Sequence, residues 1–296
     1  TESTSGTDVP TGPYWYTHPN SSGNRIAGGT ADLRDTVPVR IEVDSPPRWL
    51  VAHPAPKGSY WTAVTDDDQA VRWHVTGEEV IDEVLLGPQT SESPPVVASN
   101  AGEHRLLNEP SIKSPRSGQL VVPKTDRSTR PRRVFVARNG DLVVDGKNRN
   151  RFSVDAPPDV RPVAVGDGRF ALYSGVTDRY GHGALGDGLE PTSLLVVDAV
   201  DPRILSQTVL DPPTVFEGLQ PIVADVDGDG TPEIVTTVAD SRDGARIAIY
   251  SVAGERIATG PVYGPGWRHQ LAVGPFGPDG VTEIGVVLKP HVNRTL

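Results

Sequence analysis

Short apolar runs that recur at a regular spacing constrain this chain more than any other feature of its sequence. Glu233-Ile234 returns 50 residues later as Glu283-Ile284, and at the same offset Val223 corresponds to Val273. Gly (31) and Pro (29) together make about one residue in five a turn former. Many short runs joined by Gly/Pro turns are typical of an all-β chain. A period of about 50 residues further indicates a repeat architecture.

Four apolar runs in each repeat indicate four strands. The clearest unit has runs at 221–224, 233–238, 246–252 and 256–263, and the unit before it at 162–165, 170–173, 194–197 and 204–209. Earlier units have runs at 120–122, 133–137 and 141–144, and at 39–43, 49–52, 61–64 and 71–75. The continuously apolar runs are typical of strands that are packed on both faces. A two-sheet sandwich is the alternative, but it does not explain the repeat.

We therefore predict an all-β fold, a β-propeller of four-stranded antiparallel blades. About five blade units are visible, and we expect about five to seven blades in the intact fold. Residues 26–296 are expected to form the propeller and residues 1–25 a flexible polar segment. The last unit, from Gln270, has only two of its strands. Either the segment near 26–33 completes this blade, or the C-terminal part of the propeller is missing; we favour the second explanation.

An acidic loop, Asp-Val-Asp-Gly-Asp-Gly-Thr-Pro-Glu, separates two of these runs. The carboxylates of Asp225, Asp227, Asp229 and Glu233, with the carbonyl of Thr231, provide a set of hard oxygen ligands that suits Ca²⁺. The loop is similar to the first half of an EF-hand, but it lacks the Glu at position 12 and has β-type flanks. We predict a structural Ca²⁺ site; a solvated acidic turn is the alternative.

Residues 225–235 (DVDGDGTPEIV) resemble the FG-GAP/VCBS repeat signature, which occurs in integrin-α-like propellers and in many secreted prokaryotic proteins. Good matches to the repeat cover roughly residues 160–296. The resemblance implies a Ca²⁺-loaded propeller at or outside the cell surface, and it implies no particular activity. The second copy of the loop, at 275–283, keeps only the last two of its acids, and we expect it to hold its shape without metal.

A long Gly-rich loop interrupts the unit before the acidic loop. Its candidate functional residues are Asp178, Arg179, Tyr180, His182, Asp187 and Glu190. His, Asp and Glu side chains of this set could ligate a metal or act as acid and base, and Arg and Tyr could bind an anionic or sugar-like ligand. The alternative is an Ω-loop that is held together by its own hydrogen bonds.

Composition restricts location and partners. The net charge of −10 argues against nucleic-acid binding, and no apolar run approaches the ~18 residues of a membrane span. Without any Met, the chain is expected to start at a processed N-terminus, after removal of a signal or with a lipoprotein tether; a trimmed chain is the alternative. Asn20 and Asn293 lie in glycosylation sequons. Without Cys, disulfides and thiolate chemistry are excluded.

Three functions fit these observations. The first is a secreted or cell-surface, calcium-stabilised module that binds a protein or glycan on a propeller face. The second is an extracellular polysaccharide lyase or hydrolase that uses the loop 178–190, and the third is a self-assembling building block. We favour a non-enzymatic role, because one loop is the only local group of residues that could serve as acid and base. Fold alone does not decide among these functions.

Overall fold

The computed structural model describes residues 14–17, 38–55, 57–77, 79–89, 95–100, 103–107, 120–122, 127, 131–146, 148–157, 159–181, 188–262, 264 and 268–288. Within these ranges all helices and strands assigned are β-strands, 21 in number, and they form six antiparallel sheets. No helix in this part of the chain has the length and apolar character that crossing a membrane requires. The predicted all-β propeller is confirmed.

We name the sheets blades A to F. Blade A contains β2 (Pro47–Pro54), β3 (Ser59–Thr65), β4 (Gln69–Thr76) and β5 (Glu79–Pro88); blade B contains β1 (Tyr14–Thr17), β6 (Val96–Asn100) and β7 (Glu103–Leu107). Blade C contains β8 (Leu120–Val122), β9 (Arg132–Val136), β10 (Asp141–Asp145) and β11 (Arg149–Ser153). Blade D contains β12 (Val163–Gly166), β13 (Arg169–Thr177), β14 (Glu190–Asp198) and β15 (Arg203–Val209). Blade E contains β16 (Val215–Ala224), β17 (Glu233–Asp240), β18 (Gly244–Tyr250) and β19 (Arg256–Thr259); blade F contains β20 (Arg268–Gly274) and β21 (Glu283–Leu288).

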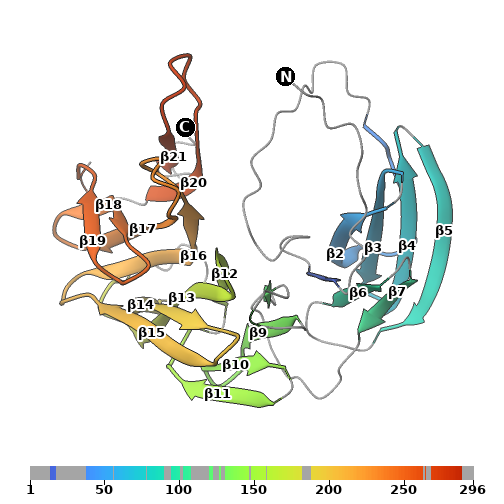
Figure 1. Cartoon of the computed structure of the whole chain (residues 1–296), viewed down its shortest axis with the longest axis horizontal. Helices are drawn as coiled ribbons and strands as arrows, with labels where there is room; N and C mark the ends of the chain where they lie inside the picture. The colour runs from blue at the N-terminus through green and yellow to red at the C-terminus, as the bar shows by residue number, and fades with distance from the viewer. Residues whose placement is uncertain are drawn as a thin grey trace.

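The blades follow one another along an arc that runs from blade A to blade F (Figure 1). Neighbouring blades meet through their first strands: β1 contacts β2 and β8, β8 contacts β12, β12 contacts β16, and β16 contacts β20. Each blade therefore has an inner strand, and the later strands of the sheet lie progressively further from the centre. This radial arrangement is the hallmark of a β-propeller.

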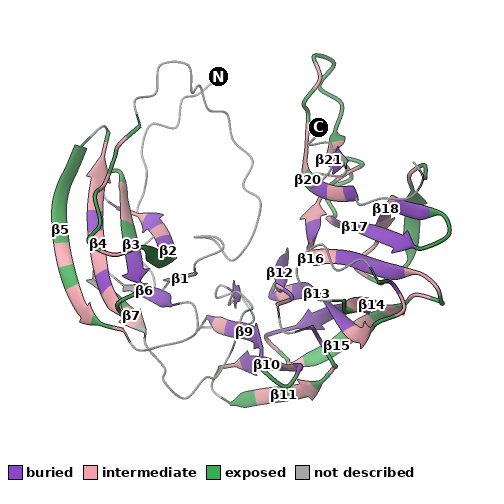
Figure 2. Ribbon diagram, turned by 180° about the vertical axis from the view of Figure 1, so that it is seen from behind, coloured by how far each residue is buried: buried purple, intermediate pink, exposed green. Residues whose placement is uncertain are grey.

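Burial is lowest on the outermost strands of the blades (Figure 2). Every residue of β8 and β17 is buried, whereas β19 is exposed throughout and the outer strands β5, β11 and β15 are mostly exposed or half-buried. Inner strands pack against blades on both sides, and this explains why their sequences are continuously apolar instead of alternating. The largest apolar core joins blades C, D and E.

The repeat predicted the strands of blades D and E closely, but it misplaced those of blade A. No strand forms at 39–43, where we expected the first one, and the fourth strand is instead β5, which the apolar runs did not indicate. The apolar residues of β5 stand in two short groups, Val80-Ile81 and Val84–Leu86, separated by Asp82 and Glu83, and they are largely exposed, so they did not read as one strand. The first strand of blade A, β2, is therefore the run that we predicted as its second strand.

Blade B was not predicted, because its inner strand comes from the start of the chain. Strand β1 lies within the segment 1–25 that we expected to be flexible, and it pairs antiparallel with β6, more than 75 residues further along. A partnership over such a distance leaves no local signal in the sequence. The segment 26–33, proposed to complete the last blade, and the sequons at Asn20 and Asn293 lie outside the described residues.

Candidate metal centre and neighbouring sites

The acidic loop connects β16 to β17 at one end of blade E. Ala224 and Glu233, which flank it, are directly paired in the ladder, so the chain between them must fold back on itself. Gly228 and Gly230 have φ angles of 81° and 86°, a left-handed conformation in which a Cβ atom is strained. The sequence pattern of alternating acids and glycines thus produces a compact loop.

Backbone amides organise the three aspartates. The carboxylate of Asp225 accepts hydrogen bonds from Gly228 N at 2.8 Å and from Gly230 N at 3.0 Å. Asp227 accepts one from the backbone of Asp229 at 3.1 Å, and Asp229 accepts one from Thr231 N at 2.6 Å. These bonds hold the side chains in place and use only some of the carboxylate lone pairs. The remaining lone pairs are available to a metal ion.

The aspartates fit a calcium ion. One carboxylate oxygen from each of Asp225, Asp227 and Asp229 lies within 4.8 Å of the other two. Since Ca²⁺–oxygen distances are about 2.3–2.6 Å, oxygens around one ion are at most about 5 Å apart. The three side chains are exposed, and among the described residues no Lys or Arg forms an ion pair with them. Ca²⁺ would supply the positive charge that the loop lacks.

Glu233 and Thr231 hold different positions from the aspartates. The Glu233 side chain is buried, and its carboxylate accepts a hydrogen bond from Val226 N at 2.8 Å. Burial raises the pKa of Glu233, as do the three neighbouring aspartates, against the lowering effect of the bond from Val226. Glu233 therefore supports the loop from the inside. Thr231 is exposed at the end of the loop, and its role as a carbonyl ligand stays a prediction.

Removing calcium is expected to destabilise the protein. With free Ca²⁺ at about ten times Kd, binding to the folded state adds about 1.4 kcal/mol to the free energy of unfolding. A chelator should therefore lower the Tm, and Asp227→Ala should abolish this calcium dependence, as differential scanning calorimetry would show. Asp279→Ala, in the second loop, is the matched control and should keep it. An equal calcium response in the Asp227→Ala protein would contradict a site at this loop.

The loop after β13 is anchored by two of the predicted binding residues. The guanidinium of Arg179 donates hydrogen bonds to the carbonyls of Leu210 and Thr214. Tyr180 is buried with Val215 in a small apolar cluster. Both side chains thus bind the protein itself, and we assign them a structural role. Asp178 is exposed, whereas His182 and Asp187 lie outside the described residues, so ligand binding by this loop stays a prediction.

Glu190 approaches a carboxyl group that sequence reasoning missed. Glu217, in β16, is only 2% exposed, and burial, with the charge of Glu190, raises its pKa to about 9. Burial and the charges of Glu217 and Glu190 also raise the pKa of Tyr180. No local pattern marks Glu217, because Tyr180 and Glu190, the titratable groups with which it interacts, are more than 25 residues away in the sequence.

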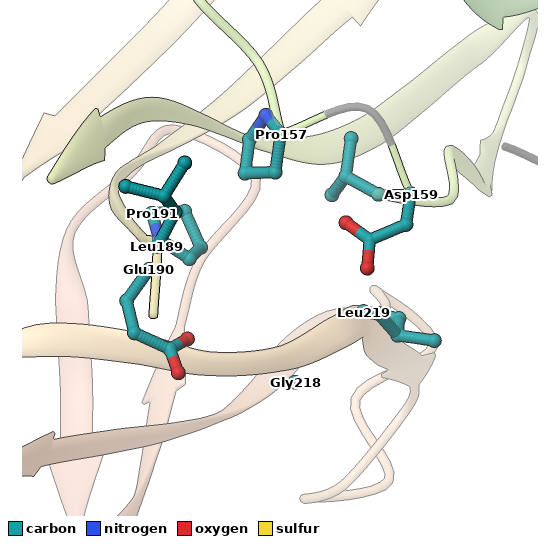
Figure 3. A pocket seen from close by; sticks show the side chains of 8 residues that line it. Pro157, Asp159, Leu189, Glu190, Pro191, Gly218 and Leu219 are labelled. Carbon is teal, nitrogen blue, oxygen red and sulfur yellow. The ribbon is translucent and has the colours of Figure 1, made fainter. Parts of the chain in front are cut away.

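The pocket beside Glu190 is small. Figure 3 shows Asp159 and Glu190 on opposite sides of it, with Pro157, Pro191 and Leu219 completing its walls. Its volume of about 30 Å³ accommodates water but not a sugar ring. The polysaccharide lyase or hydrolase, which would also use His182 and Asp187 outside the described residues, stays a prediction.

A larger cavity lies beside the acidic loop and was also missed from sequence. It has a volume of about 440 Å³. Asp167 and Arg169 of blade D line one side, Asp225 and Gly230 of the acidic loop line a second side, and Val273 of blade F lines a third. Its mixed charges come from turns that are far apart in the chain, and no motif in the sequence connects them.

Comparison with known proteins gives similarities of structure only. No protein-family model and no curated protein matches this sequence. The structure of BBS1N in complex with ARL6DN matches with a TM-score of 0.40 and 12% identity, over 84% of this chain and 76% of that one. BamB from Moraxella catarrhalis matches with a TM-score of 0.32 and 10% identity, over 86% of this chain and 87% of that one. Membership of the FG-GAP/VCBS family stays a prediction.

Proposed function

We propose that this protein is a non-catalytic binding module, a β-propeller braced by Ca²⁺ that acts at or outside the cell surface and binds a protein partner through blade F and the adjoining edge of blade E. The donor set of the metal loop supports the calcium part of this proposal. The resemblance of DVDGDGTPEIV to the FG-GAP/VCBS signature supports the extracellular part, because that signature occurs in integrin-α-like propellers and in many secreted prokaryotic proteins.

The observation that carries the protein-binding role is an exposed apolar side chain on an inner strand. Leu271 of β20 is 49% exposed, whereas the inner strand β8 is completely buried. Phe276 and Val281, in the turn that follows β20, are 60% and 59% exposed, and Ile257 of the adjacent blade is 55% exposed. Three of these four side chains belong to the β20–β21 hairpin, and neighbouring exposed apolar groups are typical of protein-binding surfaces.

A glycan partner is the second candidate, favoured by the polar cavity of about 440 Å³ beside the metal loop. Asp167, Arg169 and Asp225 offer carboxylate and guanidinium groups that hydrogen-bond hydroxyls. The cavity lacks an aromatic side chain among its lining residues, so it offers no flat apolar surface on which a sugar could stack.

A partner-capture experiment tests the proposal. The immobilised protein, in millimolar Ca²⁺, is exposed to extracellular proteins of its source cells and, in parallel, to a glycan array. We expect a protein that binds saturably, and we expect Phe276→Asp to weaken its affinity by about tenfold or more, since exposed aromatic residues are common binding hot spots.

The matched control is Val209→Asp, which alters a residue that is 62% exposed on β15 of blade D. It should leave the affinity of the purified partner within about twofold of the unsubstituted protein. Equal weakening by both substitutions would contradict a binding surface on blade F. Binding to the glycan array alone would favour the second candidate.

A further inference from the structure

The outer strand of blade D has an exposed edge without charged residues. Strand β15 pairs with β14 on one side, and in the described part of the chain no strand pairs with its other side. The chain around β15, from 188 to 262, is described without a gap. Every residue between Arg203 and Asp211 is uncharged. An exposed edge of this kind can pair with a strand of another chain.

The other outer strands are better protected against such pairing. Strand β5 carries three acidic residues, and β11 carries two arginines. Strand β19 is only four residues long. Charged residues and a short length are common devices that prevent an edge strand from pairing with another chain. Among the described outer strands of the four-stranded blades, β15 therefore has the least protected edge.

Two residues of β15 direct their backbone polar groups outward. Leu210 N donates a hydrogen bond to Thr192 O of β14 at 2.9 Å. Because hydrogen-bonded and non-hydrogen-bonded positions alternate along an antiparallel pair, the N–H and C=O groups of Gln207 and Val209 point away from β14. Leu205 lies at a β-bulge, where the register of the pair shifts. The edge that is open to pairing is therefore centred on Gln207.

Apolar side chains flank this centre. Leu205 is 41% exposed and Val209 is 62% exposed. Gln207, which lies between them, is also exposed. Large exposed apolar side chains beside unpaired backbone groups favour the addition of a further strand, because pairing buries both.

Blade E holds β15 in place from one face. The hydroxyl of Ser206 donates a hydrogen bond to the carbonyl of Val252 at 3.2 Å, and the hydroxyl of Thr208 donates one to the carbonyl of Gly254 at 2.6 Å. These two residues alternate with the residues whose backbone groups point outward. The strand is thus pre-organised, so that little conformational entropy is lost when its edge is paired.

The edge is complementary to itself. When two copies of β15 are aligned antiparallel about Gln207, Leu205 of one copy lies opposite Val209 of the other. The two Gln207 residues lie opposite each other on the two-fold axis, where their outward N–H and C=O groups can exchange hydrogen bonds. Apolar residues thus meet apolar residues, and an amide side chain meets an amide side chain.

No like charges meet in this alignment. Arg203, at the start of the strand, lies opposite Asp211, just beyond its end. Arg203 is exposed and forms an ion pair with exposed Asp201 at 2.8 Å. A further contact of Arg203 with Asp211 therefore supports the register of the two strands and adds little to their affinity.

We propose that two copies of the chain form a dimer in which the outer edges of their β15 strands pair antiparallel about Gln207. The pairing joins blade D of one copy to blade D of the other in one continuous sheet. Because the same surface serves in both copies, the contact is isologous and closes as a dimer. It uses no residue of blade F, so this inference goes beyond the proposed partner binding and does not depend on it.

Charge substitutions at Gln207 test both the dimer and its register. Sedimentation velocity of the full chain over a series of concentrations measures the dimer Kd. We expect the unsubstituted protein to dimerise reversibly, and Gln207→Lys and Gln207→Glu each to raise the Kd by about tenfold or more, because like charges then face each other on the two-fold axis. A mixture of the two variants should recover the dimer, since the introduced charges are then opposite in sign.

Two further variants make the test specific. Ser153→Lys adds the same charge to an exposed position of the outer strand β11 and should leave the dimer Kd within about twofold. Gln207→Pro removes an N–H group that points away from β14, so it should keep the Tm of the protein and abolish the dimer. Hydrogen exchange of the Val209 amide should be slower at high protein concentration than at low concentration.

Several results would overturn the proposal. They are a protein that stays monomeric at every concentration, a mixture of Gln207→Lys and Gln207→Glu that does not associate, equal dissociation by Ser153→Lys, and species larger than a dimer. If Gln207→Pro weakens binding of the captured partner and leaves self-association unchanged, a segment of that partner occupies the edge of β15, and the second copy does not.

Discussion

Replacing Glu217 with glutamine is expected to increase the free energy of unfolding by up to about 5 kcal/mol at about pH 8, the linkage expected for a pKa raised from 4.5 to about 9. The Glu217 side chain is 2% exposed, and burial, reinforced by the charge of Glu190, raises its pKa to about 9. The folded protein therefore carries a protonated Glu217 at neutral pH. Glutamine has a similar shape and no charge to desolvate, so it removes the cost of keeping the proton.

The direction of the pH dependence follows from proton binding. In the unfolded chain Glu217 loses its proton near its ordinary pKa of 4.5, whereas in the folded protein it keeps the proton up to about pH 9. Between these values the folded state binds more protons, so its stability falls as pH rises. Above the folded pKa the difference in protonation disappears, and the contribution of this group to the slope ends.

Urea unfolding at about pH 6, 7 and 8 measures this effect. The unsubstituted protein should lose stability across the series, and Glu217→Gln should reduce the slope by up to about 1.4 kcal/mol per pH unit. Glu255→Gln, at an exposed turn of blade E, is the matched control and should leave the slope unchanged. Parallel curves for the Glu217→Gln and unsubstituted proteins would contradict a protonated Glu217.

The repeat in the sequence was sufficient to predict the propeller and the strands of blades D and E. It succeeded there because the first three strands of these blades are buried along much of their length and read as apolar runs, such as Leu194–Val197. It failed for β5, whose side chains are mostly exposed, and for blade B, whose inner strand β1 comes from the start of the chain. The apolar residues of β5 stand in two short groups separated by Asp82 and Glu83, and the partner of β1 lies far along the chain, so neither strand gives one continuous local signal.

The same distinction applies to the candidate sites. The spacing of Asp225, Asp227 and Asp229 was informative, because a short loop alone brings the three carboxylates together. The hydrogen bonds of Arg179 could not be predicted, since their acceptors, the carbonyls of Leu210 and Thr214, are more than 30 residues away, and ligand binding by Arg179 stays a prediction. The cavity beside the acidic loop has no sequence signature, because it arises where three blades meet.

Phe216→Ala is expected to reduce the free energy of unfolding by about 3–5 kcal/mol, the loss typical of removing a buried aromatic side chain. Phe216 lies on β16, has no exposed surface, and belongs to the core that joins blades C, D and E. Its ring stacks on Tyr173 of blade D with centroids 5.2 Å apart, and it meets the edge of Tyr250 at 5.9 Å. Alanine removes both aromatic contacts and leaves a cavity between two blades.

Guanidinium-induced unfolding measures the loss, with Phe276→Ala as the matched control. Phe276 carries the same side chain but is 60% exposed, so its removal should cost less than about 1 kcal/mol. Because Phe216 connects blade D to blade E, we also expect its removal to separate the unfolding of the two blades, seen as non-coincident fluorescence and circular dichroism transitions. Equal losses for the two substitutions would show that the blades are not held together through this aromatic cluster.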